Sequence, residues 1–79
     1  MDGVLELPTE VQDRPDKYVI YVDAPECRAQ DVRVSARKRR VQVTTPQGTC
    51  TVTLPDPIDE AGIAAEFFGG ELRVAVPKR

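Results

Sequence analysis

The stretch AEFFGGELRVAVPK, residues 65–78, predicts two strands joined by a tight turn. Apolar residues in its second half alternate with polar or small ones, as in a strand with one buried face. These apolar positions are Leu72, Val74 and Val76. Gly69 and Gly70 offer the positive backbone angles that a short hairpin turn needs, and Pro77 ends the second strand because proline cannot donate to a ladder. We therefore expect an antiparallel hairpin with one face turned toward a core.

The same alternation recurs upstream in three further runs. Residues 32–36, 41–44 and 49–54 each place an apolar residue at every second position. The basic run at residues 37–40 separates the first pair of runs, and a Thr-Pro-Gln-Gly turn at residues 45–48 separates the second pair. Turn residues between alternating runs are typical of hairpins, so we expect two hairpins here.

Residues 17–24, KYVIYVDA, are rich in β-branched and aromatic residues and end at Pro25. Such a run predicts a central strand that is apolar on both faces. Residues 58–62 follow two prolines and predict a loop. A helix from Asp59 through Phe68 is the alternative, but Gly62 interrupts it and the remaining run is too short for a stable helix. We therefore predict a strand at residues 65–68.

Short strands separated by turn signals, with almost no helix, predict an all-β fold. We expect an immunoglobulin-like β-sandwich of two antiparallel sheets with seven or eight short strands. A chain of 79 residues has room for one hydrophobic core only. We therefore expect a single domain over residues 1–79, with its core over about residues 9–78.

The composition excludes several function classes. The chain has no histidine, which removes the usual general base and the commonest zinc ligand. We expect no enzyme activity, no cofactor and no metal. Cys27 and Cys50 lack the spacing of a metal site, and in a reducing compartment we expect both to stay free thiols.

The charge pattern gives no sign of a nucleic-acid or membrane partner. The net charge is -2, and no apolar run approaches the roughly 20 residues of a membrane span. Asp2 and Glu6 stand where a signal peptide is basic and then apolar, so we expect a cytoplasmic location. The basic run at residues 37–40 has no aromatic stacking platform and is interpreted as a solvated hairpin tip, with a phosphate or acidic partner as the alternative.

Several motifs, in order along the chain, resemble the α-crystallin domain of the small heat-shock proteins. Residues 18–25 match that family's "Y-V-x-x-x-D-x-P", and residues 65–78 are similar to its closing "A-x-x-x-N-G-V-L-x-V-x-x-P-K". Leu54-Pro55 matches its "hydrophobic-L-P", and residues 30–34 resemble its "x-E-D-I/V-x-V". The resemblance covers about residues 9–78 and implies the same sandwich fold.

The resemblance also implies a function, that of an ATP-independent molecular chaperone of the stress response. Such a holdase binds partly unfolded client proteins and keeps them from aggregating. In the family, a groove between the fourth and eighth strands receives I-x-I tails or clients. Carried over by position, the resemblance places the client-binding groove at Val32, Val34, Ala36, Ala65, Phe67 and Phe68. Alternation alone assigns the valines and Phe67 to the core, and it predicts that Phe68, on the opposite face, is exposed.

The chain departs from the family pattern in several places. Glu71 stands where the family usually has an apolar residue, and Phe68 where it usually has a polar one. The turn at residues 45–48 replaces a long loop that carries a swapped strand in many relatives, so we expect no strand exchange. Since the chain ends at Arg79 without an I-x-I segment, we expect a monomer or a weak homodimer and a weak holdase.

Two other functions remain open at this stage. One is a co-chaperone or scaffold docking domain of the CS type, which binds its partner through a sheet face. The other is an accessory α-crystallin-like module of a larger protein.

Overall fold

The computed structural model describes residues 9–25 and 27–79, so the predicted beginning of the domain lies outside the described residues. The strands are β1 (Thr9–Asp13), β2 (Lys17–Asp23), β3 (Arg33–Arg37), β4 (Arg40–Thr45), β5 (Gly48–Thr53), β6 (Ala64–Phe68) and β7 (Glu71–Pro77). Two short 3-10 helices, η1 (Ala29–Asp31) and η2 (Glu60–Gly62), lie in the connections. Neither helix is long or apolar enough to cross a membrane.

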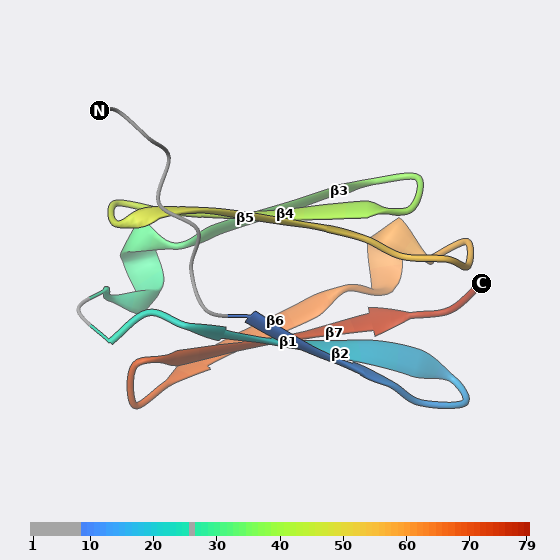
Figure 1. The fold of residues 1–79 in the computed structure, drawn as a ribbon, viewed down its shortest axis with the longest axis horizontal. Helices are drawn as coiled ribbons and strands as arrows, with labels where there is room; N and C mark the ends of the chain where they lie inside the picture. Colours follow the sequence, from blue (N-terminus) through green and yellow to red (C-terminus); the bar gives the residue numbers. More distant parts are fainter. Residues whose placement is uncertain (1–8, 26) are drawn as a thin grey trace.

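The strands form two antiparallel sheets that pack face to face (Figure 1). The order is β1-β2-β7-β6 in the four-stranded sheet and β3-β4-β5 in the three-stranded sheet. Figure 1 shows the two layers edge-on, with η1 and η2 at opposite ends of the sandwich. The predicted β-sandwich of two antiparallel sheets is confirmed, with seven strands in the described part of the chain.

The predicted hairpins are present with the expected registers. In the β4-β5 hairpin Val41 pairs with Val52 and Val43 with Cys50, and Thr45 pairs with Gly48 across the turn. The hydroxyl of Thr45 accepts hydrogen bonds from the backbone N–H groups of Gln47 and Gly48, which fixes the turn. The connection therefore closes within the chain and carries no exchanged strand, as the sequence predicts.

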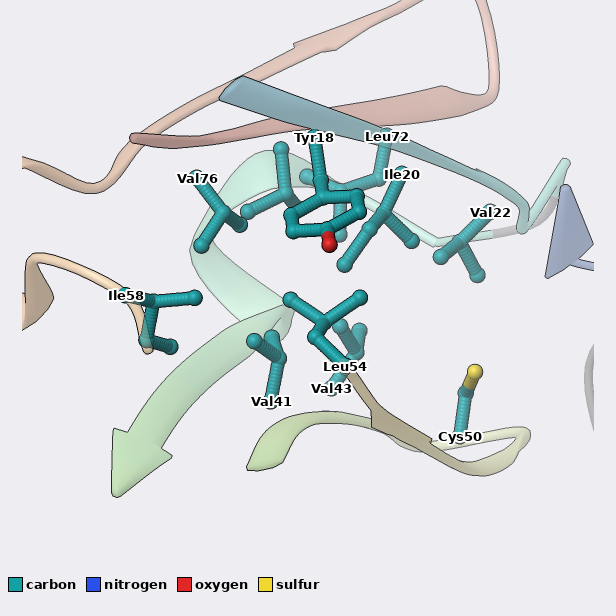
Figure 2. Close-up of a cluster of buried hydrophobic side chains, with 11 residues drawn as sticks. Tyr18, Ile20, Val22, Val41, Val43, Cys50, Leu54, Ile58, Leu72 and Val76 are labelled. Carbon is teal, nitrogen blue, oxygen red and sulfur yellow. The ribbon is translucent and has the colours of Figure 1, made fainter. Parts of the chain in front are cut away.

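The core lies between the two sheets and follows the alternation of the sequence. Figure 2 shows side chains of β2 and β7 pointing toward those of the opposite sheet. The cluster consists of Tyr18, Ile20, Val22, Val41, Val43, Cys50, Leu54, Ile58, Leu72, Val74 and Val76. Ile58 is placed by an isolated bridge to Lys78, which ties the β5-β6 connection to the end of β7. The buried apolar faces of β2, β4, β5 and β7 provide the main stabilising contribution.

Cys27 lies in the connection after β2, and Cys50 faces the core from β5. Both are buried, free thiols. The sulfur of Cys50 lies 2.9 Å from the hydroxyl of Thr9, which joins the end of β1 to the opposite sheet.

The β6-β7 turn depends on Gly70. Its backbone φ is +83°, and a Cβ atom at this position would lie 2.9 Å from the backbone Cα of Pro25. The carbonyl of Gly70 also accepts a hydrogen bond from the N–H of Ala24 at 2.8 Å. The turn therefore packs tightly against the connection that leaves β2.

We expect Gly70→Ala to lower the free energy of unfolding by at least about 2 kcal/mol, because it adds a backbone clash to the strain of positive φ. Gly69→Ala is the matched control, since φ there is +60° but no atom lies within 4 Å of the added Cβ. The control should cost about 1 kcal/mol, from strain alone. Urea denaturation measures both losses, and equal losses would show that the contact with Pro25 does not matter.

A polar cluster at one end of the sandwich surrounds the ring of Tyr18. The Tyr18 hydroxyl donates a hydrogen bond to the carboxylate of Asp56. The Lys78 ammonium lies 2.6 Å from a carboxylate oxygen of Asp13 and 4.6 Å from the centre of the Tyr18 ring. These contacts connect β2, the β5-β6 connection and the end of the chain.

The hydrogen bond to Asp56, together with burial and the negative charge of the carboxylates, raises the pKa of Tyr18 to about 12. An unfolded chain releases this proton near pH 10, at about the ordinary pKa of tyrosine. The folded state thus binds the proton more tightly, and its contribution to stability is complete below pH 10 and declines toward pH 12. We expect the free energy of unfolding to fall over this range more steeply in the native chain than in Tyr18→Phe. Parallel urea titrations of the two proteins at several pH values test this, and equal slopes would contradict it.

Candidate groove between strands β3 and β6

The edge strands β3 and β6 belong to opposite sheets and border one open side of the sandwich. Each is paired with one neighbour only, β3 with β4 and β6 with β7. A groove of about 450 Å³ lies between them. It is lined by Val34, Ser35, Ala36, Glu60, Ile63 and Ala65. A groove between two strand edges combines pockets for side chains with backbone donors and acceptors along the edges.

The structure brings three of the six predicted site residues into this groove: Val34, Ala36 and Ala65. The two residues on β3 are half-buried and pack against the core from its margin, so each presents only part of its surface to the groove. The register explains this position, because Val34 pairs with the buried Val43 and therefore shares its inward face. Ala65 is exposed on the opposite wall.

The other three predicted residues lie outside the groove lining. Val32 and Phe67 are half-buried and pack against the core. Phe68 pairs with Glu71 on the outer face of the four-stranded sheet and is 86% exposed. Alternation along β6 separates the two phenylalanines, and it predicts correctly that Phe68 is exposed.

Sequence reasoning missed Ile63, Ser35 and Glu60 as lining residues. Ile63 follows η2 and precedes β6, and it packs against the core while contributing to the groove. It is a single apolar residue in a connection, so no periodic pattern marks it. Glu60 lies in η2, which brings the β5-β6 connection to the groove.

A hydrogen bond closes one end of the groove. The carboxylate of Glu60 accepts a hydrogen bond of 2.6 Å from the backbone N–H of Lys38, in the β3-β4 turn. Lys38 has a φ of +59°, which is unusual for a residue with a side chain. Its neighbours in the basic run are all exposed, in accordance with the interpretation as a solvated hairpin tip.

Among the lining residues that the structure describes, Glu60 alone is ionisable, and Ser35 has no histidine to activate it because the sequence contains none. Among residues 9–25 and 27–79, no cluster of three cysteine, aspartate or glutamate side chains is arranged to hold a metal ion. The groove therefore offers a surface for binding, with apolar residues beside two polar ones.

No model of a known protein family and no curated protein matches the sequence. Solved structures are similar. Heat shock protein 16.0 from Schizosaccharomyces pombe is 23% identical, with a TM-score of 0.90 over 98% of this chain and 69% of that one. The hspA of Xanthomonas axonopodis is 20% identical, with a TM-score of 0.84 over 98% and 97% of the two chains. A small heat-shock protein from Xylella fastidiosa is 22% identical, with a TM-score of 0.81 over 98% and 89%.

These structures are small heat-shock proteins, and the present chain superposes on them over nearly its whole length. The strand order and the hairpins described above agree with the resemblance seen in the sequence motifs. The chain has the fold of the small heat-shock proteins, that of the α-crystallin domain.

Proposed function

We propose that this domain is an ATP-independent holdase that binds partly unfolded client proteins in the groove between β3 and β6. The observation that carries the proposal is the open groove between two unpaired strand edges, whose lining includes the apolar residues Val34, Ala36, Ile63 and Ala65. An unfolded chain offers what such a groove binds, namely extended backbone and exposed apolar side chains. The likeness to structures of heat-shock proteins supports the same role.

The apolar part of the lining offers selectivity by shape, beside the polar Ser35 and the charged Glu60. Its apolar residues, Val34, Ala36, Ile63 and Ala65, are small or branched, which favours β-branched or leucine side chains at alternate positions of an extended ligand. A folded protein rarely exposes such a strand, because its apolar side chains are buried and its edges protected. We therefore propose clients in their unfolded state, in a reducing cytoplasmic compartment.

Light scattering of reduced α-lactalbumin tests the function directly. This client aggregates without heating once its disulfides are reduced, so the domain stays folded during the assay, and its own free thiols have no disulfide to lose. We expect suppression of aggregation that grows with domain concentration, without ATP. An apolar I-x-I peptide in excess should compete, because it occupies the same groove.

A docking domain of the CS type is the second candidate, because the outer face of the four-stranded sheet is also uncovered. It predicts the opposite result in the same assay. A docking domain leaves aggregation of the client unchanged and does not respond to the competing peptide.

A further inference from the structure

The outer face of the four-stranded sheet forms a second surface, away from the groove. The strand registers show which residues share this face. They are Glu10 and Gln12 on β1, Lys17, Val19, Tyr21 and Asp23 on β2, Glu71, Arg73, Ala75 and Pro77 on β7, and Ala64, Glu66 and Phe68 on β6. Val19 is only 5% exposed although it lies outside the core cluster between the sheets. The face thus has an apolar floor of its own.

The floor is hollowed and has a projecting side chain beside it. A depression of about 380 Å³ has Val19, Ala64 and Ala75 among its lining residues. A neighbouring depression of about 430 Å³ is lined in part by Phe68, and both share Glu66 and Arg73. Small residues at one end of the face and an 86% exposed phenyl ring at the other are complementary in shape.

Charge divides the same face into two ends. Lys17 lies at one end of β2. Both Lys17 and Arg14 line the depression that contains Val19. Asp23 lies at the other end of β2 and pairs with Glu71. The basic and acidic ends are separated by Arg73, whose guanidinium lies 5.5 Å from the centre of the Tyr21 ring.

We infer that this face binds a second copy of the chain in a two-fold symmetric, face-to-face dimer. A two-fold axis in the plane of contact and perpendicular to the strands reverses the strand direction of the second copy. The basic end of each copy then lies over the acidic end of the other, with Lys17 opposite Asp23 in two equivalent places. Phe68 is level with Asp23, so the same operation carries it to the level of Lys17, about two residues past Ala64 of the second copy's β6 and beside the depression that Ala64 and Lys17 line.

The area of the face sets the strength of the dimer. Four strands about 4.8 Å apart and about 20 Å long cover roughly 400 Å² per copy. The two copies together then bury roughly 800 Å², which is below the roughly 1,200 Å² of total surface that stable complexes bury. We therefore expect a weak dimer, with a dissociation constant on the order of 100 μM. The inference does not depend on the proposed client groove, because the two surfaces lie on opposite sides of β6.

Sedimentation velocity of the native chain from about 10 μM to 1 mM, concentrations that bracket a weak interface, tests the dimer. Lys17→Glu should raise the dissociation constant at least about tenfold, because each dimer then contains two contacts between like charges. Asp23→Lys should do the same. The double variant Lys17→Glu/Asp23→Lys restores opposite charges and should recover the affinity of the native chain. Added salt should weaken the native dimer.

Phe68→Ala provides a variant without a charge change and should also weaken the dimer about tenfold. Val11→Ala is its control, since Val11 is 41% exposed but shares an inward register with Ile20 on β2. Circular dichroism confirms that each variant is folded. A native chain that is monomeric at every concentration overturns the inference. A dimer whose affinity is unchanged by all of these substitutions places the interface elsewhere and also overturns it.

Discussion

Leu72→Ala is expected to lower the free energy of unfolding by about 2 to 5 kcal/mol, the usual cost of removing a buried leucine side chain. Leu72 is 2% exposed and lies in the core cluster on β7, a central strand of its sheet. The total stability of a domain of this length is about 4 to 12 kcal/mol, so the loss is a large part of it. The melting temperature should fall by more than about 10 °C.

The matched control is Phe68→Ala, which removes a larger side chain from the neighbouring strand. Phe68 is 86% exposed, so its ring gains little from the folded state. We expect a change of no more than about 0.5 kcal/mol. Thermal melts followed by circular dichroism at low protein concentration measure both effects without a contribution from a dimer. A large loss in Phe68→Ala would show that the outer face stabilises the monomer.

Ala65→Glu is expected to weaken client protection strongly while leaving the fold intact. Ala65 is exposed on the wall of the groove, so a glutamate there does not enter the core. It places a carboxylate on a surface that an apolar client must cover, and burying an unpaired charge is costly. We expect the domain concentration needed for half-protection of reduced α-lactalbumin to rise at least about tenfold.

Ala64→Glu is the matched control, with the same residue, the same substitution and the adjacent position. Ala64 is also exposed, but it faces the outer side of β6 and lines the other depression. Client protection should remain close to that of the native domain. Equal losses in the two variants would mean that added negative charge, and not the groove, controls the assay.

The strands that the sequence predicts well are those with one buried face. In β7, a shift of one residue would turn Leu72, Val74 and Val76 to solvent, so the alternation determines both the strand and its orientation. β1 is different, because Val11 is its single apolar residue and is itself 41% exposed. It is a strand because it pairs along its whole length with the edge of β2, a tertiary contact that has no local signal.

The candidate site is predictable only in part, because alternation locates residues within strands but not residues that a connection places. Val34, Ala36 and Ala65 follow from strand alternation together with the resemblance to a known domain. Ile63 does not, since η2 and the connection before β6 place it there. Phe68 was assigned to the groove by its position in the family motif, whereas alternation along β6 places it on the outer face.

Val19 shows a different limit. The sequence predicts that β2 is apolar on both faces, and Val19 is indeed buried on the outer one. No second layer lies over this face among the residues that the structure describes, and Val19 lines a depression together with Tyr21 and Arg73, which contact each other. The apolar pattern of β2 predicts that Val19 is buried, but it does not reveal that the surface around Val19 is available to another chain.

Chemical-shift mapping by nuclear magnetic resonance tests the client groove most directly, and a chain of 79 residues is well suited to it. The ¹⁵N-labelled domain is titrated with an apolar I-x-I peptide at a low, constant domain concentration. We expect the shifted amides to cluster at residues 33–37 and 60–65, on the two edges of the groove. Shifts confined to the outer face around Val19, Arg73 and Ala75, or no shifts at saturating peptide, would contradict it.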